Sequence, residues 1–227
     1  VVKRRHSCAV RRGGDAHVEK TGPEHVVKGE SDWYQHIPPP LSDLFPQAVS
    51  VSQHPDRDLS SMVLTRVAGV TYSHLSANFC VTPGRLVALL DSLKRLHTEA
   101  GSTDQVSDEL LCTNYARKVK QRYQKHEAFL RAFGADVPQR ASKIVSFLED
   151  YESSKRFNKA GYIHGDPAFS TVLLTHDGRV KFLDMRGALG DVLTTCGDVA
   201  YDLSKVYQSL CGYDFLLLDQ PIKDPEA

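Results

Sequence analysis

The chain has 227 residues, of which 41% are hydrophobic and 25% charged, with 28 basic and 28 acidic side chains. This is the composition of an ordinary globular protein, long enough for one large domain or two small lobes that share a cleft. A formal net charge of zero excludes a global electrostatic attraction to nucleic acid or to an anionic membrane. We therefore expect neither as a partner, and any charged ligand would need a local site.

The five cysteines are odd in number and form no C-x-x-C pair, which fits neither a disulfide framework nor a zinc site. No apolar run reaches the roughly 18 to 20 residues that a membrane-spanning helix needs, and the first residues lead into polar sequence rather than a signal-peptide core. These features indicate reduced thiols and a soluble cytoplasmic protein. Because the chain begins with Val1, a fragment that lacks upstream sequence is one option.

The first 67 residues are predicted to form strands and one helix. Arg12-Gly13-Gly14-Asp15 is a turn signal between two strands, the second over 16–20. The spacing of apolar residues predicts a helix over 26–35, which the prolines at 38–40 stop. The run SMVLTRV, 61–67, is predicted to be an edge strand that leads into a linker.

The rest of the chain is predicted to be mostly helical. Five leucines share one face of a helix over 84–97, and a long helical region over 104–156 is broken near Gly134 and Pro138. A β-hairpin follows, with strands over 171–174 and 179–183, and an amphipathic helix covers 198–210. We expect two lobes that share a cleft, the first over 1–67 and the second over 68–227.

Two aspartates flank the predicted hairpin, Asp166 in a His-Gly-Asp turn and Asp184 after the second strand. A hairpin brings these two positions to one edge, so we expect the carboxylates to be neighbours with Thr171 between them. Phosphoryl transfer needs a carboxylate near the attacking hydroxyl, a second carboxylate to hold Mg²⁺, and usually another oxygen ligand. Taken alone, the His-Gly-Asp turn is equally typical of a helix cap or turn former.

The same chemistry needs a cation on the nucleotide phosphates. Lys20 ends the second predicted strand, and Glu30 falls on the helix that follows. Glu30 would then pair with Lys20 and hold its ammonium toward the cleft. The alternative is that both are solvated surface charges.

These residues resemble the aminoglycoside phosphotransferase and choline kinase group of the protein-kinase-like fold. The resemblance rests on His164-Gly165-Asp166, Phe182-Leu183-Asp184 and the stretch GDVAYDL over 197–203, and it runs from about residue 16 to 218. The flanking sequence is more similar to one branch, the small-molecule kinase domains associated with capsular polysaccharide biosynthesis. That likeness is carried by Glu30-x-x-Trp33-Tyr34, Ile37-Pro38, Leu44-Phe45-Pro46, Gly161-Tyr162-Ile163 and Gly212-Tyr213-Asp214-Phe215.

The resemblance implies an α+β, two-lobed fold with a small N-lobe and a larger, mostly helical C-lobe. It implies an ATP-dependent phosphotransferase that uses Mg²⁺ and acts on a hydroxyl of a small molecule, a sugar or related metabolite. The strand and glycine-rich loop that cover the phosphates in this family would precede or overlap residue 1, which would leave the N-lobe truncated. The glycines at 13 and 14 are better explained by an ordinary hairpin turn.

The resemblance also implies a role for each matching residue. Asp166 would orient the substrate hydroxyl or accept its proton, Asp184 would bind Mg²⁺, and Lys20 would contact the phosphates with Glu30 as its partner. His164 would support the catalytic turn. The remaining implied positions are Thr65, Arg66 and Val67 as the hinge whose backbone meets adenine, and Asp202 as a brace that accepts backbone hydrogen bonds from the turn.

Thr171 stands where the family has asparagine as the second metal ligand. A hydroxyl is shorter than a carboxamide and a poorer donor to Mg²⁺. A weakened enzyme, an enzyme with a different metal demand, and a pseudokinase or nucleotide-binding scaffold without turnover all stay open. A choline kinase-like activity is not favoured, because the aromatic cage for a quaternary ammonium cannot be located.

Other candidate sites carry less weight. The ten histidines are scattered and are not spaced as zinc ligands, and Ser170 lacks the G-x-S-x-G elbow of a hydrolase. The basic stretch over 118–125 is typical of a solvated helix face, with contact to a phosphorylated or acidic substrate at the cleft mouth as the alternative. The sequence makes no prediction of the oligomeric state.

Overall fold

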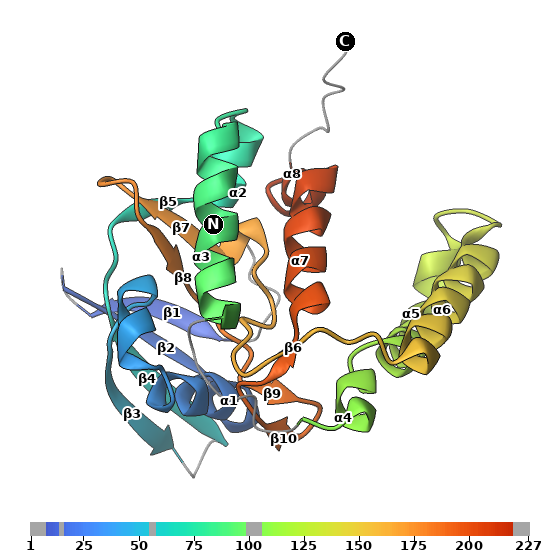
Figure 1. Ribbon diagram of the computed structural model, residues 1–227, viewed down its shortest axis with the longest axis horizontal. Helices are drawn as coiled ribbons and strands as arrows, with labels where there is room; N and C mark the ends of the chain where they lie inside the picture. The colour runs from blue at the N-terminus through green and yellow to red at the C-terminus, as the bar shows by residue number, and fades with distance from the viewer. Residues whose placement is uncertain (1–7, 14–15, 55–57, 99–105, 220–227) are drawn as a thin grey trace.

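Four antiparallel strands form the N-terminal sheet of the structure, a computed structural model that describes residues 8–13, 16–54, 58–98 and 106–219 (Figure 1). The strand order is β1-β2-β4-β3. The predicted N-terminal hairpin is confirmed, with Gly13 opposite His17, although turn residues 14 and 15 lie outside the described residues. The strands are β1 (Ala9–Gly13), β2 (His17–Pro23), β3 (Ala48–His54) and β4 (Leu59–Thr65).

Two predictions for this sheet are wrong. The strand predicted at 61–67 as an edge is β4, which lies inside the sheet because β3 pairs along its other side. Strand β3 was not predicted, although Val49 and Val51 alternate with Ser50 and Ser52; all of its side chains are exposed. Lys20 does not end its strand; it lies within β2, opposite Val10 on one side and Met62 on the other.

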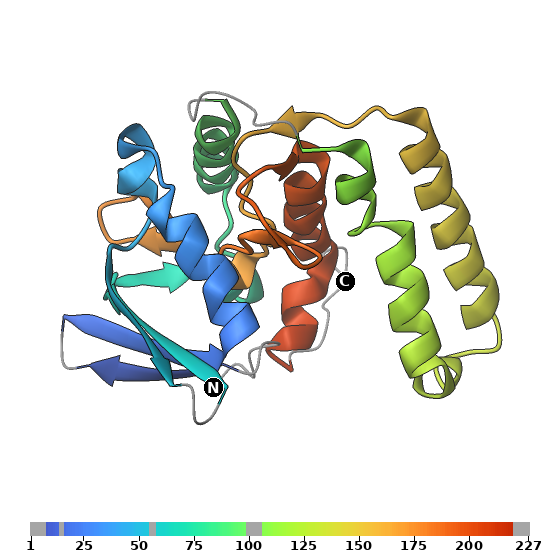
Figure 2. The same ribbon diagram turned by 90° about the horizontal axis from the view of Figure 1, so that it is seen from below.

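Helix α1 (Glu24–Gln35) packs across this sheet and confirms the helix predicted at 26–35 (Figure 2). Val27 and Trp33 are fully buried on its inner face. The Trp33 indole Nε1 donates a hydrogen bond to the carbonyl oxygen of Ile163 at 3.0 Å. The proline run then forms η1 (Pro39–Leu44), a 3₁₀ helix. Helix α1 is thereby tied to a segment 130 residues further along the chain.

Two glycines allow α1 to approach the segment that follows β8. A Cβ atom on Gly29 would lie 2.7 Å from the carbonyl oxygen of Arg186, and one on Gly187 would lie 1.8 Å from the carbonyl oxygen of Gly29. Gly187 also has a φ of +61°, which side chains disfavour. Backbone therefore meets backbone at this point, and no larger residue fits on either side.

The predicted helical regions are confirmed in outline. α2 (Tyr72–Ala77) and α3 (Pro83–Thr98) come first, and α3 buries Leu89, Leu93 and Leu96, whereas Leu90, predicted on the same face, is 38% exposed. The region 104–156 is divided into α4 (Asp108–Cys112), α5 (Ala116–Arg131) and α6 (Val137–Ser154), with residues 104 and 105 outside the described part. The break predicted near Gly134 and Pro138 is confirmed between α5 and α6. Pro138 lies in the first turn of α6, where its missing N–H has no intrahelical partner to lose.

The predicted hairpin near the carboxyl end is confirmed as β7 (Val172–Thr175) and β8 (Val180–Phe182), and β5 (Gly69–Thr71) adds a third strand beside β7. Phe169 and Phe182 are fully buried around it. The last predicted helix is α7 (Val199–Gln208), which ends earlier than expected. A short π-helix, η4 (Ser209–Tyr213), follows it and leads into α8 (Asp214–Leu217). Short elements complete the structure: β6 (Lys159–Ala160), η3 (Phe169–Thr171), β9 (Ala188–Leu189), β10 (Val192–Leu193) and β11 (Gly197–Asp198).

Helices α5 and α6, here called the arm, stand side by side at the far side of the molecule from the four-stranded sheet (Figures 1 and 2). None of the residues of α6 is buried. Tyr151 Oη donates to Asp198 at 2.6 Å, and Glu152 accepts the N–H of Ala116 at 2.8 Å. The C-terminal end of α6 is therefore fixed to its surroundings.

Across the described chain, no helix has the length and hydrophobicity that crossing a membrane requires.

The glycine contact is tested by replacing Gly29 with alanine. Although alanine favours a helix by about 1 kcal/mol over glycine, we expect Gly29→Ala to lower the free energy of unfolding by about 1–3 kcal/mol, because the methyl group collides with a backbone carbonyl. Denaturant unfolding measures this. The control is Gly84→Ala in α3, where a Cβ atom meets nothing within 4 Å, and its stability should be unchanged or higher. A Gly29→Ala protein as stable as the Gly84→Ala protein would contradict the tight contact.

Candidate active site

The His164-Gly165-Asp166 turn is held in place by Asp202 of α7. The Asp202 carboxylate is fully buried and accepts the backbone N–H groups of His164 at 2.8 Å and Gly165 at 2.7 Å. It also lies 2.9 Å from Nε2 of His97 on α3. Hydrogen bonds from several donors to one buried carboxylate fix a turn firmly. The conformation of the turn is thus set by a residue 36 positions after Asp166.

His164 lies behind the turn, fully buried. Its Nδ1 atom accepts the N–H of Asp166 at 3.2 Å, and its ring packs edge-on against Phe182, with ring centroids 5.4 Å apart. Burial lowers the pKa of the imidazole and outweighs the opposing effect of nearby carboxylates, chiefly Asp202. The neutral ring is therefore the form that supports Asp166, and the proton it retains is on Nε2.

Asp166 is paired with two cations. Arg186 Nη2 lies 3.0 Å from one carboxylate oxygen, and Lys205 Nζ lies 3.0 Å from the other. Burial would raise the pKa of Asp166, but Lys205 and Arg186 together hold it below its ordinary value. The carboxylate is consequently charged at neutral pH and can accept a hydrogen bond.

Neither cation was identified from the sequence. Arg186 follows Asp184 by two residues, and Lys205 follows Asp202 by three residues on α7. Only this spacing from two recognised aspartates could have drawn attention to them. Their contact with Asp166 depends on the tertiary fold.

Lys20 joins β2, α1 and the segment after β8. Its ammonium forms a buried ion pair with Glu30 and lies 3.0 Å from Oδ1 of Asp184. Lys20 is 6% and Glu30 is 2% exposed, so the alternative that both are solvated surface charges is wrong. Burial would lower the pKa of Lys20, but the Asp184 and Glu30 carboxylates raise it above its ordinary value. The lysine is therefore a fixed cation between two carboxylates.

Asp184 adopts a left-handed backbone conformation with a φ of +61°. Aspartate and asparagine tolerate this region better than most residues. The carboxylate turns toward Lys20, while the next residues lead to Arg186, whose N–H donates to the carbonyl oxygen of His164 at 2.9 Å. The two segments that flank the hairpin are therefore in contact, and the proximity of the Asp166 and Asp184 carboxylates stays a prediction.

Thr171 contacts both flanking segments, as its predicted position between them requires. Its hydroxyl lies 2.8 Å from the carbonyl oxygen of Asp166 and 2.9 Å from that of Ala168, and its own carbonyl accepts the N–H of Leu183 at 2.9 Å. The single hydroxyl hydrogen is thus directed into the turn. The role of Thr171 as a metal ligand stays a prediction.

Two cavities meet at the segment 184–186. The first, here called the sheet-side cavity, has a volume of about 280 Å³ and is lined by Lys20 and Asp184, by the predicted hinge residues Thr65, Arg66 and Val67, and by Val18, Leu64, Leu173 and Leu183. The second, here called the arm-side cavity, has a volume of about 840 Å³ and is lined by Asp166, Arg186 and residues of α5, α6 and α7. Thus Lys20, Asp184 and the hinge line one cavity, and Asp166 lines the other.

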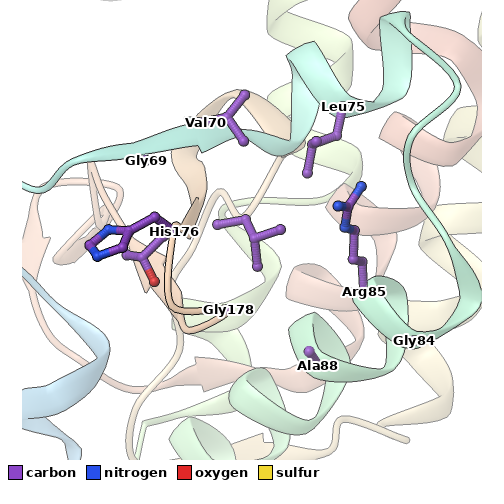
Figure 3. A pocket seen from close by; sticks show the side chains of 10 residues that line it. Gly69, Val70, Leu75, Gly84, Arg85, Ala88, His176 and Gly178 are labelled. Atoms are coloured by element: carbon purple, nitrogen blue, oxygen red, sulfur yellow. The ribbon is translucent and has the colours of Figure 1, made fainter.

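A third cavity of about 560 Å³ lies elsewhere, between β5, α2, α3 and the β7–β8 turn. Figure 3 shows Arg85 and His176 on opposite sides of it, with Val70, Leu75 and Ala88 along the wall. None of the predicted site residues lines this cavity. It therefore does not belong to the candidate active site.

Comparison of the three-dimensional structure with solved structures finds proteins of similar fold. No family model and no curated protein matches the sequence. The aminoglycoside phosphotransferase APH(3'')-Id from Streptomyces rimosus superposes with a TM-score of 0.60 at 16% identity, over 89% of this chain and 74% of that one. A thermostable mutant of APH(4)-Ia gives 0.60 at 12% identity (90% and 73% covered), and an aminoglycoside-3'-phosphotransferase of type VIII gives 0.57 at 16% identity (96% and 84% covered).

At these identities the similarity shows a shared fold. The chain has the kinase-like fold of the aminoglycoside phosphotransferases, with a small antiparallel sheet and a larger helical part. The α+β fold and the resemblance inferred from the sequence are confirmed at this level. The division at residue 67 and the roles of the individual site residues stay predictions.

Burial of His164 predicts a pH effect on stability. Because its pKa in the folded protein is lower than the unfolded value of about 6.5, the unfolded chain binds the proton more readily. The free energy of unfolding should fall as the pH drops below about 6.5, by at most about 1.4 kcal/mol per pH unit from this residue. Denaturant unfolding between pH 8 and pH 5 measures the slope.

The variant His164→Asn keeps an acceptor for the N–H of Asp166 but cannot titrate, so its stability should depend less steeply on pH. His176→Asn, an exposed position in the β7–β8 turn, controls for the loss of an imidazole. Identical slopes for the wild type and His164→Asn would show that His164 binds its proton equally well in both states.

Proposed function

We propose, from this kinase-like fold, that the protein is an ATP-dependent phosphotransferase that acts on a hydroxyl of a small molecule, a sugar or related metabolite. The observation that carries the proposal is the buried Lys20 held between Glu30 and Asp184, next to a turn that presents the charged Asp166. Two structural neighbours support it: APH(3'')-Id was solved with ADP and streptomycin, and APH(4)-Ia with ADP and hygromycin B.

The sheet-side cavity would take the nucleotide. The aliphatic side chains of Val18, Leu64 and Leu173 suit the faces of a purine. In the predicted hinge, the N–H of Thr65 already donates to Gln47 and that of Arg66 to Ala16. The backbone of Val67 is therefore the hinge position that we assign to the adenine edge, and the phosphates would extend toward Lys20.

The residues present fit a magnesium ion. Mg²⁺ in nucleotide sites is usually held by one or two carboxylates together with phosphate oxygens and water, and Asp184 provides such a carboxylate where Lys20 would hold the phosphates. Among the described residues, no group of three acidic, histidine or cysteine side chains offers a different site. When bound, the metal would neutralise charge on the phosphates, with Asp184 as its main protein ligand and Thr171 as a weaker one.

The protein's own side chains account for the rest of the reaction. The Asp166 carboxylate would accept a hydrogen bond from the acceptor hydroxyl and orient its oxygen toward the terminal phosphorus of ATP. As the new P–O bond forms and the bond to ADP breaks, the hydroxyl proton passes to Asp166. Lys20 would stabilise the phosphate charge from the sheet side, and Arg186 and Lys205 from the arm side.

A nucleotide-binding domain without turnover is the second candidate, and Thr171 favours it. Its hydroxyl hydrogen serves the carbonyl oxygens of the turn, and its side chain is shorter than that of the asparagine it replaces. The metal would then rest mainly on Asp184. Binding and turnover must therefore be measured separately.

Replacement of the two aspartates should separate binding from chemistry. We expect Asp184→Asn, which tolerates the left-handed backbone, to weaken Mg²⁺-dependent ATP binding at least about tenfold. Asp166→Asn should leave ATP affinity within a factor of about two and reduce kcat by about 10²–10⁴. Calorimetry with ATP and Mg²⁺, and ADP release over a panel of sugars, measure the two effects. Unchanged Mg²⁺-dependent binding in Asp184→Asn would refute the metal assignment.

The variant Thr171→Asn decides between the two candidates. If the protein is a weakened enzyme, restoring the carboxamide should raise kcat with the same acceptor and leave ATP binding nearly unchanged. ATP binding without turnover in both proteins, on every acceptor of the panel, would instead establish the nucleotide-binding domain. Thr171→Val, which has the same shape without the hydroxyl, is the matched control for loss of the turn hydrogen bonds.

A further inference from the structure

The arm-side cavity has a strong excess of positive charge. Five basic side chains line it, and a single carboxylate, that of Asp166, accompanies them. The formal net charge of the whole chain is zero, so this excess is local. The basic residues are Lys118 and Arg122 of α5, Arg140 of α6, Arg186, and Lys205 of α7.

The carboxylates of the protein do not neutralise this cluster. Asp166 is shared between Arg186 and Lys205, and Arg140 pairs with Asp136 on the surface. Within the described chain, neither Lys118 nor Arg122 forms a salt bridge with a carboxylate. Lys118 donates instead to two neutral acceptors, Asn114 Oδ1 at 3.1 Å and Tyr201 Oη at 2.9 Å.

The ionisation of Lys118 reflects this imbalance. Burial, followed by the neighbouring cations Arg186, Arg122 and Lys205, lowers the pKa of its ammonium to about 7. Crowded cations in a partly buried cavity are unfavourable unless a negative charge joins them. Asp166 is the one carboxylate among the residues that line this cavity, so Lys118 near neutral pH either loses its proton or keeps it beside an anion that a ligand brings.

The basic stretch over 118–125 divides between cavity and solvent. Lys118 and Arg122 are four residues apart on one face of α5 and line the cavity. Lys120 pairs with Glu149 of α6, and Lys125 is exposed; neither lines the cavity. The solvated-face interpretation therefore holds for Lys120 and Lys125 and fails for the half-buried Lys118. Arg122 is exposed to solvent and also lines the cavity.

We propose that the acceptor is an anion, a small hydroxylated molecule that carries a phosphate or carboxylate group bound by Lys118 and Arg122. This inference rests on the proposed function, because it assigns the acceptor to the cavity that Asp166 faces. An arginine fork binds either kind of oxyanion through two parallel hydrogen bonds. An aminoglycoside, with its protonated amines, would be repelled by the same side chains.

The nucleotide does not explain these two cations. ATP phosphates would lie beside Lys20 in the sheet-side cavity, whose lining includes neither Lys118 nor Arg122. Arg186 and Lys205 each lie 3.0 Å from the Asp166 carboxylate, beside which the transferred phosphoryl group would arrive. Lys118 and Arg122 lie beyond them on the arm, where the acceptor would extend. The far wall, with Phe129, Leu130 and Ile144, would contact its less polar part.

Binding measurements on the full chain test this inference without requiring turnover. Calorimetry in the presence of saturating ADP would compare hexose 1- and 6-phosphates, uronic acids, neutral hexoses and streptomycin. We expect an anionic sugar to bind at least about tenfold more tightly than its neutral counterpart, and streptomycin not to bind. The sugar phosphates and uronic acids distinguish phosphate from carboxylate recognition.

Paired variants on α5 locate the site. Arg122→Gln should weaken binding of the anionic sugar about tenfold, the usual effect of losing a charge-assisted hydrogen bond, while ADP affinity stays unchanged. Lys125→Gln, the same loss of one charge outside the cavity, should bind the sugar like the wild type. Equal loss in both variants would indicate a general charge effect and overturn the site.

The outcomes also separate this inference from the proposed function. ADP binding with no preference for anionic over neutral sugars overturns the anionic acceptor and leaves the phosphotransferase proposal intact. Anion binding that depends on Arg122, in a chain that binds neither ADP nor ATP, overturns the phosphotransferase proposal and retains only an anion site. ATP turnover with an anionic sugar, lost on removal of the anionic group, supports both.

Discussion

The close approach of helix α1 to the segment after β8, at Gly29 and Gly187, is the constraint on which the candidate site depends. Because these two backbones touch, the next residue of α1, Glu30, reaches Lys20, and Trp33 one turn further along binds the carbonyl of Ile163. The sheet, which provides Lys20, and the helical part, which provides Asp166 and Asp184, are thereby held in one register. A helix displaced by a single methyl group would separate the charges that the chemistry needs close together.

The ion pairs at the two cavities are arranged in opposite ways, although basic side chains outnumber carboxylates in the lining of both. On the sheet side, one cation, Lys20, is shared by two carboxylates, which suits a divalent metal ion joined by nucleotide phosphates. On the arm side, one carboxylate, Asp166, is shared by two cations, with further basic residues beyond them. The segment 184–186 turns Asp184 toward one cavity and Arg186 toward the other. In the proposed reaction, a phosphoryl group moving from donor to acceptor would cross this boundary while cations flank it on both sides.

The sequence predicts those parts of the fold and site in which local pattern and tertiary structure agree. Helix α1 and the β7–β8 hairpin follow from apolar spacing and turn residues, and Asp166 and Asp184 from their positions around that hairpin. Strand β3 was not predicted, although Val49 and Val51 alternate with Ser50 and Ser52, because this alternating stretch is short and its side chains are exposed rather than packed in a core. Arg186 and Lys205 could not be assigned because each meets Asp166 only after β8 and α7 have packed beside the turn. Charge pairs between distant segments leave no periodic signal in a single sequence.

Helix α6 has no buried residue, and its hydrogen bonds and ion pairs to neighbouring elements come from its C-terminal turns, at Glu149, Tyr151 and Glu152. Its N-terminal turns, which bring Val137, Arg140 and Ile144 to the arm-side cavity, therefore open at a low free-energy cost compared with the core around Trp33 and Phe182. One wall of the arm-side cavity is thus a part of the fold that a ligand could remodel at low cost. Amide protons in these turns should exchange quickly in the free protein and slow when a molecule fills the cavity, so an acceptor could be recognised by the order it imposes before any product is detected.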